Sequence, residues 1–566
     1  MTAPRPLADA AAALAAGDLD RAESICRSAL AARRDHPPAL NLLAIALHRL
    51  GRSSEAEAAA TRATALAPRF PDPWNTLGLI DRAAGRHGEA VERFRAAVDR
   101  EPAFVEAWIN LVESLDSMGR PQEMLSALRR ALAAVPNDRR LEGKLGRALA
   151  LANELAESEA VLRRVIAAAP GDRAVRVDLA TTTALQGRYD EAIALLETSL
   201  ADDPAHTGTM INLAVLHRDA GRYPAALGWI DRAIGRSPRD PLAHFTRGVV
   251  LMGLGRLAEG WEEMEWRWRR SDWTTVWRAS RRPVWSGEPL AGKRLLVWSE
   301  QGIGDAILHA SMVGDLRSWA DRLRIEAAPR LVPLFARSFP WAEVVAATGR
   351  GSIAEDRDVA AHVPAGSLGR FLRPSLPAFP PSGSFLRADA AVADAMRRRY
   401  RQAAGGTPVI GVSWRSTAGH FKNAPLADWQ PILRARAGHF VSLQYGDTAA
   451  DIAAAETATG VRVHVDPSVD PLTDLDRFAG QVAAMDLVIT TSNTTAHVAG
   501  ALGVPCWVMV PRGRGALWYW FGDGDRSPWY GSVRLYPQTE PFDWSGAVRR
   551  IADVLRQAGP VGAWVA

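Results

Sequence analysis

Two short stretches of the sequence combine residue types that suit chemistry on an anionic substrate. The first is EQGIGD, in which Gly302 and Gly304 form a tight turn and Asp305 follows. The second is a run of small polar residues closed by a histidine, and its members are Ser492, Asn493, Thr494, Thr495 and His497. Hydroxyls and the N–H groups at a helix start both favour a phosphate. We therefore expect an anion site at the second stretch and a reactive carboxylate at the first.

Each stretch also has an ordinary structural explanation. An Asp at a helix start is most often a cap, and a capping box explains a single Asn or Thr. Four small polar residues in a row, followed by His497, exceed what a cap requires. Asp305 is a candidate general base because the second stretch supplies a donor site opposite. Arg415 and Lys422, on the loop after VIGVSWRS, are expected to add positive charge to the same crevice.

The elements around both stretches alternate between strand and helix. In the first half we expect strands at 295–298, 323–327 and 344–347, with helices at 306–320 and 330–339. In the second half we expect a strand with its exit loop at 409–416 and a strand with its turn at 440–446. A helix at 474–485 and a strand–loop–helix–strand unit at 486–511 should follow. Such alternation predicts parallel sheets with ligand beyond the carboxyl ends of the strands. The turn lacks GxGxxG, so no dinucleotide cofactor is indicated.

The N-terminal part of the chain is repetitive. Prolines recur every 34 residues, at 68, 102, 136, 170, 204 and 238. A turn glycine recurs in phase at 51, 85, 119, 187, 221 and 255, with Asn153 in the odd repeat. Glycine supplies a left-handed turn and proline ends a helix, so each period is a helix pair that must stack on its neighbours. The pattern resembles the tetratricopeptide repeat and predicts an α-solenoid of about seven repeats over 1–271.

One polar column recurs on the first helix of successive repeats. Its members are Asn110, Lys144, Asp178 and Asn212. Asparagine amides can clamp the backbone of an extended peptide, which makes the column a candidate acceptor groove. The alternative is a solvated helix face, because exposed helix positions are polar by default.

A tryptophan-rich linker at 272–292 follows the repeats. Interleaved Arg and Trp can bind nucleic acid. The more favoured reading is aromatic side chains that join the solenoid to the next domain. The net charge of +5 over 566 residues gives no strong case for nucleic acid. Two isolated cysteines, Cys26 and Cys506, and no apolar run of 18 residues fit a cytoplasmic protein without membrane insertion.

Four segments together resemble a known enzyme group. They are the EQGIGD turn, SWR…KNAPL, SLQYG and TTSNTTAHVAGALG. They are similar to bacterial heptosyltransferase-like glycosyltransferases of the GT-B superfamily, in the subgroup with N-terminal tetratricopeptide repeats. This resemblance implies two Rossmann-like halves, at 293–400 and 401–566. It also implies flagellin glycosyltransferase activity with a nucleotide-sugar as substrate and no cofactor.

The resemblance assigns roles to particular residues. Asp305 matches the acid implicated as base, Lys422 a phosphate-binding lysine, and His497 the donor-phosphate loop. Relatives carry Asp where this chain has Ser492, a difference that fits another donor sugar, such as a nonulosonic acid. The expected function is metal-independent transfer of a sugar to Ser or Thr of a protein held by the repeats. A lipopolysaccharide glycosyltransferase and a non-catalytic repeat scaffold are the alternatives.

Overall fold

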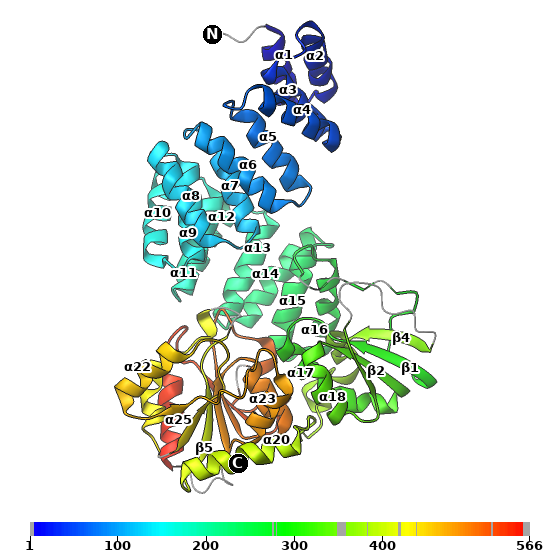
Figure 1. The fold of residues 1–566 in the computed structure, drawn as a ribbon, viewed down its shortest axis with the longest axis vertical. Helices are drawn as coiled ribbons and strands as arrows, with labels where there is room; N and C mark the ends of the chain where they lie inside the picture. The colour runs from blue at the N-terminus through cyan, green and yellow to red at the C-terminus, as the bar shows by residue number, and fades with distance from the viewer. Residues whose placement is uncertain are drawn as a thin grey trace. The chain divides into compact units, whose positions relative to one another are not determined.

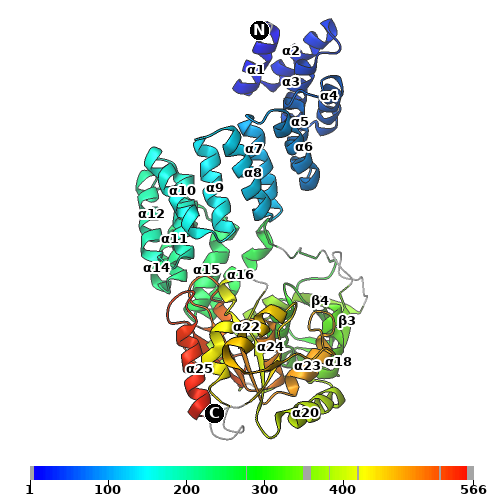
Figure 2. The same ribbon diagram turned by 60° about the vertical axis from the view of Figure 1, so that its left-hand side comes forward.

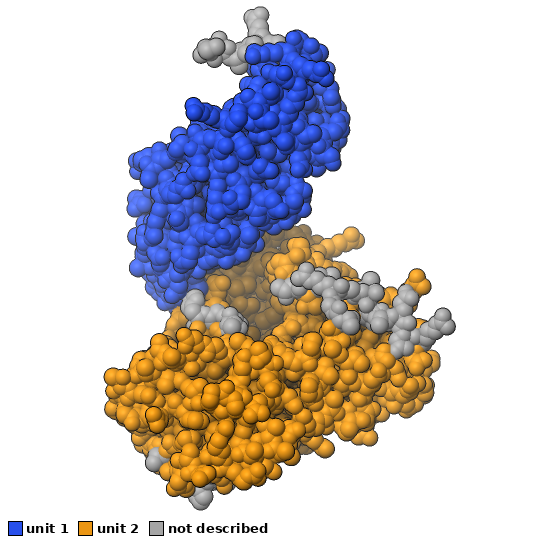
Figure 3. Space-filling model, viewed as in Figure 1, with its two compact units in different colours: residues 1–202 blue, residues 203–566 orange. Residues whose placement is uncertain are grey.

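The computed structural model describes residues 5–273, 275, 277, 278, 280–347, 358–381, 383–416, 420–436, 438–521 and 524–557. The predicted linker and both predicted halves therefore contain some residues outside this description. So does the loop between Arg415 and Lys422, at residues 417–419. The chain forms two compact units, 1–202 and 203–566 (Figure 3).

The first unit is built from antiparallel helix pairs (Figure 1). Its helices are α1 (Arg5–Ala16), α2 (Leu19–Ala32), α3 (Pro37–Arg49), α4 (Ser53–Leu66), α5 (Asp72–Ala83), α6 (His87–Arg100), α7 (Val105–Ser117), α8 (Pro121–Ala134), α9 (Arg139–Leu151), α10 (Leu155–Ala168), α11 (Arg173–Leu185) and α12 (Tyr189–Asp202). The predicted turn residues Gly51, Gly85, Gly119, Asn153 and Gly187 have φ between 65° and 82°. The left-handed turn expected within each pair is therefore confirmed.

Small residues allow the paired helices to approach closely. A Cβ on Gly78 would lie 2.5 Å from a ring carbon of Phe94 on the next helix. A Cβ on Gly146 would overlap the Leu162 side chain in the same way. Since interiors are close-packed, a larger residue at either position would force the pair apart.

Four helices of the repeat pattern belong to the second unit. They are α13 (Thr207–Asp219), α14 (Tyr223–Arg236), α15 (Pro241–Gly253) and α16 (Leu257–Met264), and the short helix η1 (Glu265–Arg269) follows. Trp261 of α16 is 2% exposed and donates its indole N–H to the Arg373 carbonyl at 2.8 Å. Met252, Leu257 and Trp261 share one hydrophobic core with the strands that follow. The last helix pair is thus part of the α/β core.

The first sheet contains β1 (Leu290–Trp298), β2 (Ala320–Ala327), β3 (Glu343–Ala346) and β4 (Val359–Pro364). The strands are parallel in the order β3-β2-β1-β4. Figure 2 labels two of them, β3 and β4. Between them run α17 (Ile303–Ala310), η2 (Val313–Ser318), η3 (Pro329–Leu331) and α18 (Val332–Ser338). After β4 come η4 (Ala365–Ser367), α19 (Gly369–Leu372) and η5 (Leu376–Ala378).

The helix predicted at 306–320 is too long. The structure ends α17 at Ala310, where the Ser311 hydroxyl donates to the Leu308 carbonyl at 2.6 Å and competes with continued helix. β2 also begins at Ala320, three residues before the predicted start, because Ala320 already pairs with Leu290 of β1. The intervening residues form the short helix η2 instead.

The second sheet contains β5 (Val409–Ser413), β6 (His439–Ser442), β7 (Val463–His464), β8 (Leu487–Thr491), β9 (Cys506–Val510) and β10 (Val533–Pro537). All are parallel, in the order β10-β9-β8-β5-β6-β7. Its helices are α20 (Ala390–Ala404), η6 (His420–Lys422), η7 (Leu426–Trp429), α21 (Gln430–Leu433), α22 (Ala449–Thr459), α23 (Leu475–Ala483), α24 (Thr494–Leu502), η8 (Trp518–Trp520) and α25 (Ser545–Gln557). The predicted unit at 486–511 is confirmed as β8, α24 and β9.

Both sheets reverse their strand order at one point. In the first, β1 leads to β2 and β3 on one side, while β4 lies on its other side. In the second, β5 leads to β6 and β7 on one side, and β8 opens the other. Open parallel sheets bind ligands in the crevice beyond the carboxyl ends of the strands at such a reversal. EQGIGD follows β1 and the polar run follows β8, so both stretches lie at these points.

Candidate active site

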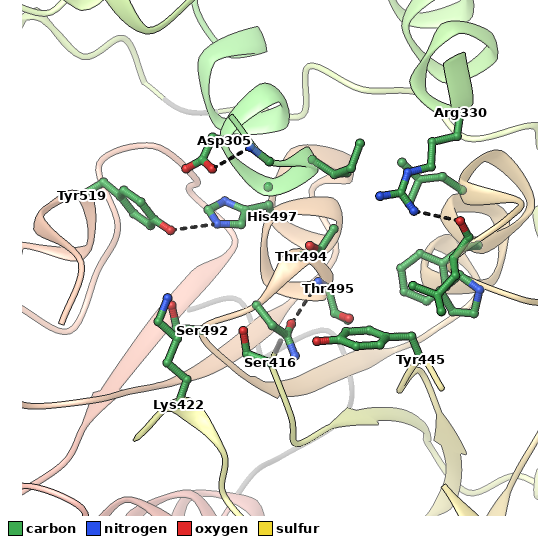
Figure 4. A pocket seen from close by; sticks show the side chains of 18 residues that line it. Asp305, Arg330, Ser416, Lys422, Tyr445, Ser492, Thr494, Thr495, His497 and Tyr519 are labelled. Carbon is green, nitrogen blue, oxygen red and sulfur yellow. Dashed lines mark hydrogen bonds between the residues drawn. The ribbon is translucent and has the colours of Figure 1, made fainter. Parts of the chain in front are cut away.

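A cavity of about 340 Å³ lies beyond the reversal points of both sheets (Figure 4). It brings together most of the residues predicted for the site, namely Gly302, Gly304, Asp305, Lys422, Ser492, Asn493, Thr494, Thr495 and His497. Figure 4 shows Asp305 and Lys422 entering the cavity from opposite sides. One wall thus comes from the turn after β1 and the other from loops of the second sheet.

Asp305 occupies the third position of α17. The Gly302 backbone N–H donates to its Oδ2 at 3.2 Å, which is the cap that the structural explanation predicted. Among the described residues no other group donates to this carboxylate. Capping holds the side chain at the cavity wall and leaves Oδ1 able to accept a proton, so the cap and the expected base are compatible.

Lys422 carries a cation into the cavity without a protein partner. Its side chain is 7% exposed, and within the described part of the chain its ammonium makes no hydrogen bond or ion pair. Burial lowers the pKa of Lys422, and the negative charge of Asp305 acts in the opposite direction. A buried ammonium without a counterion is costly, and an anionic ligand would remove that cost.

Asn493 supports the loop instead of offering its side chain to a ligand. Its Oδ1 accepts from the Thr490 hydroxyl and the Thr495 N–H, both at 3.0 Å. Its Nδ2 donates to the Ser413 hydroxyl at 2.9 Å and to the Arg415 carbonyl at 3.0 Å. These bonds use the full capacity of the amide. The side chain ties the ends of β5 and β8 together, and the expectation that Asn493, which lines the cavity, takes part in donor binding stays a prediction.

The hydroxyls of the polar run differ in availability. Ser492 is 3% exposed and accepts a hydrogen bond from the Trp520 indole at 2.8 Å. The Thr495 hydroxyl is buried and lies 3.5 Å from the Ser413 hydroxyl. Thr494 is half-buried, and its hydroxyl has no partner in the described structure. The Thr495 and Ala496 N–H groups are already bonded to Asn493. The hydroxyl and the N–H of Thr494, the first residue of α24, are therefore the part of the run that can meet an anion.

His497 is a neutral wall of the cavity. Its Nδ1 lies 2.9 Å from the Tyr530 hydroxyl and its Nε2 lies 3.4 Å from the Tyr519 hydroxyl. Burial lowers the pKa of His497 to about 3. The imidazole is thus uncharged near neutral pH, and both nitrogens are occupied by tyrosines. The expectation that this ring points at the anion is not met in this arrangement.

Gly304 is required by that histidine. A Cβ at position 304 would lie 2.9 Å from the His497 Cδ2. The two helices that begin at the cavity, α17 and α24, pack against each other at this point. The second glycine of EQGIGD therefore serves the close approach of the two halves, more than contact with a phosphate.

Arg415 does not line the cavity. Its guanidinium lies 3.3 Å from the Asp451 carboxylate and also donates to the Asp447 carbonyl. These acceptors hold the guanidinium away from the cavity, so the charge that Arg415 was expected to add to the crevice is not found there. Its neighbour Ser416 lines the cavity in its place.

A buried ion pair that the sequence reading missed supports EQGIGD. Glu300 accepts from Arg267 of η1 at 3.0 and 2.8 Å, and the Gly366 N–H donates to the same carboxylate at 2.9 Å. Both charged side chains are at most 2% exposed. Both residues stand out in the sequence, since Glu300 begins EQGIGD and Arg267 lies between two tryptophans. Their pairing joins sequence segments 33 residues apart, which no periodicity reveals.

Three further cavity residues were also missed. Arg330 lies in η3, after β2 of the first sheet, and donates to the Leu472 carbonyl at 2.8 Å. Tyr445 follows β6, and Tyr519 lies in η8. Arg330 is a second cation at the cavity, and the tyrosines offer aromatic faces on which a planar ring can stack.

The predicted groove residues are partly engaged with neighbouring repeats. Asn110 donates to the Asn75 amide at 2.9 Å. Lys144 pairs with Glu113 at 2.9 Å. Burial raises the pKa of Asp178 to about 6. Asn212 is half-buried on α13 of the second unit. The groove itself stays a prediction.

In the residues that the structure describes, no three His, Cys, Asp or Glu side chains gather as metal ligands. None of the described helices is both long enough and apolar enough to cross a bilayer.

Comparison with known proteins identifies the repeats. One tetratricopeptide repeat family matches residues 13–80 and 184–246, and another matches 75–138 and 111–173. The chain contains tetratricopeptide repeats. The solved structures it resembles include Cut9–Hcn1 of the APC/C (15% identity, TM-score 0.36, 43% of this chain and 48% of that one). Another is PilW, a type IV pilus biogenesis factor. It is 21% identical with a TM-score of 0.33, and the match covers 37% of this chain and 96% of PilW.

The match to one curated relative is longer than the repeat region. Protein FlbA of Caulobacter vibrioides (strain ATCC 19089 / CIP 103742 / CB 15) is 33% identical over 349 residues. The match covers 57% of this chain and 56% of FlbA, so the chain spans little more than half the length of that relative.

Proposed function

We propose that the chain is a GT-B glycosyltransferase that moves a sugar from a nucleotide-sugar to a Ser or Thr hydroxyl of a protein. The observation that carries this proposal is the shared cavity. In it the Asp305 carboxylate lies opposite the start of α24 and the Lys422 ammonium, which has no partner among the described residues, at the reversal points of two parallel sheets. Base and phosphate site therefore face one space of about 340 Å³, the size class of a small-ligand pocket.

The donor diphosphate or monophosphate lies against Lys422 and against the hydroxyl and N–H of Thr494 at the start of α24. Asp305 takes the proton of the acceptor hydroxyl as that oxygen bonds to the anomeric carbon. The bond from that carbon to the phosphate oxygen breaks, and the nucleotide leaves with the electron pair. Lys422 and the helix terminus stabilise its developing charge. Attack opposite the leaving group inverts the anomeric centre.

A protein acceptor is supported by the repeats. Stacked helix pairs form extended surfaces that suit polypeptides. Flagellin is proposed as the acceptor because the sequence resembles the heptosyltransferase-like glycosyltransferases that carry N-terminal tetratricopeptide repeats, a subgroup that includes flagellin glycosyltransferases.

The first experiment measures nucleotide binding by the full chain. UDP, GDP, ADP, CDP and CMP are titrated calorimetrically into wild type, Lys422→Ala and Lys293→Ala. Lys293 is an exposed lysine on β1 and is the matched control. One nucleotide should bind wild type and the control equally, and at least tenfold more weakly to Lys422→Ala. Absence of any binding, or equal binding by all three proteins, contradicts a nucleotide-sugar site and favours a non-catalytic scaffold.

The second experiment measures transfer. Intact mass of the host's flagellin is compared between cells with the wild-type chain, without it, and with Asp305→Asn. Asp394→Asn is the control, because Asp394 is exposed on α20. Deletion and Asp305→Asn should both remove the added mass, while Asp394→Asn retains it. Unchanged flagellin mass on deletion would rule out this acceptor.

A further inference from the structure

A second cavity of about 470 Å³ adjoins the first. Asp305, Lys422 and Tyr519 line both cavities, so these three side chains form the partition between them. The remaining walls are different. They come from α13, α15, α16 and η1, from the turn after β1, from Phe421, and from residues 515–518.

The walls of this second cavity are mainly apolar. Phe245 and Val249 of α15 face it, and Trp261 and Trp518 meet edge to face at 5.2 Å. Its other charged groups are neutralised within the protein. Arg218 donates to Asp219 at 2.9 and 2.6 Å, and Arg267 is held by the buried Glu300. The cavity therefore lacks a free charge suited to a second phosphate, apart from the shared partition.

His309 gives this cavity a polar group with no assigned role. It follows Asp305 by one helical turn on α17, so both side chains lie on the same face. It is 6% exposed, and its Nδ1 has no hydrogen-bond partner in the described structure. It lines the second cavity and not the first. Burial lowers the pKa of His309 to about 4, so the ring is neutral near pH 7.

We infer that the second cavity receives the acceptor segment, a stretch of polypeptide whose Ser or Thr lies between apolar neighbours. This inference rests on the proposed function. The hydroxyl reaches Asp305 at the partition, while flanking apolar side chains pack on Phe245, Val249 and Trp518. His309 lines the cavity one helical turn after Asp305 and acts as a positioning residue for the segment.

The choice of a polypeptide follows from which elements build the walls. α13 and α15 are the first helices of repeats in the tetratricopeptide pattern, and those helices line the inner face of a solenoid. A polypeptide that lies along them ends at the same cavity wall as Asp305. Sugar donor and acceptor would thus enter from separate sides, and the partition would keep the reacting atoms between them.

The test fills the cavity from two opposite sides. Val249→Trp on α15 and Ala516→Trp on the exposed facing loop each add bulk to it. Leu242→Trp is the matched control, since Leu242 lies on α15, is 44% exposed and does not line the cavity. In the full chain, both cavity variants should transfer at least tenfold less sugar to flagellin, with wild-type nucleotide affinity. Leu242→Trp should behave as wild type.

The outcomes separate this inference from the proposed function. If wild type binds no nucleotide and modifies no flagellin, the proposed function fails. If wild type transfers sugar and both filled variants transfer equally well, the acceptor does not use this cavity. If the filled variants lose both nucleotide affinity and sugar transfer, the cavity is part of the donor site. That result also overturns the inference.

The role of His309 is tested by comparing the KM for flagellin with the affinity for nucleotide in two variants. His309→Phe keeps the ring but removes its nitrogens, so KM for flagellin should rise at least fivefold, with nucleotide affinity unchanged. His309→Asn restores a hydrogen-bonding group and should recover most of the loss. A purely structural role would lower the fraction of active protein in both variants without changing KM, and that result would refute the positioning role.

Discussion

Replacing Glu300 with glutamine should destabilise the 203–566 unit by about 3–5 kcal/mol, the usual cost of breaking a buried ion pair. The substitution preserves the shape of the side chain and removes its charge. Arg267 donates to both carboxylate oxygens, at 3.0 and 2.8 Å, and the two side chains are at most 2% exposed. Arg267 keeps Glu265 as a second partner at 2.7 Å, which places the expected cost toward the lower end.

Urea unfolding followed by tryptophan fluorescence measures this cost. All tryptophans except Trp74 and Trp108 belong to the 203–566 unit, so the signal reports on it. With a slope of about 3 kcal/mol/M, the midpoint should fall by about 1 M or more. Glu259→Gln is the control, because Glu259 pairs with Arg256 in solvent and its loss should leave the midpoint unchanged. A shift for Glu300→Gln no larger than for this control would refute the reasoning.

Three further predictions concern packing and pH. Gly146→Ala should lower the stability of the first unit by about 1–3 kcal/mol, because its Cβ would overlap Leu162. The control Gly88→Ala should be neutral or slightly stabilising, because its Cβ would meet open space. Thermal unfolding followed by circular dichroism measures both. Asp178→Asn should stabilise that unit at pH 7 by roughly 3 kcal/mol at most, and the gain should vanish near pH 4, because a pKa of about 6 means that burial disfavours the charged native form. His497→Gln should make the second unit less sensitive to acid. The unfolded histidine gains a proton below about pH 6.5, and the native one only near pH 3. Between pH 7 and pH 5 the free energy of unfolding, measured by urea titration, should therefore fall by about 2 kcal/mol more in wild type than in the variant.

The solenoid was predictable in detail because its cause is local. A left-handed turn needs glycine or asparagine, and the structure places Asn153 at φ 65° where the repeat pattern lacked its glycine. The end of α17 was not predictable in this way. Ser311 competes for a helical carbonyl, and pairing of Ala320 with β1 decides where the next strand begins. Those are tertiary effects, to which the apolar pattern around 306–320 is insensitive.

The location of the site was predictable, but the roles within it were only partly so. Carboxyl ends of parallel strands meet at one edge, which brought Asp305 and Lys422 to one cavity. The sequence could not show that the Asn493 amide would hydrogen-bond to residues at the ends of two strands. Nor could it show that the His497 ring would hydrogen-bond to two tyrosines. Donor and acceptor capacity is used up by neighbours distant in sequence. Residue type alone therefore overestimates how many polar groups remain for a ligand.

The burial of Trp261 against the Gly369 backbone limits how this protein can be divided. A Cβ on Gly369 would overlap the indole, and Met252 and Leu257 belong to the same core as β1. The last helix pair is consequently a structural component of the α/β part, although its sequence is repeat-like. Exchange of the solenoid between such proteins, whether by recombination or by engineering, should succeed at the boundary after Asp202 and fail at the tryptophan-rich segment after residue 271.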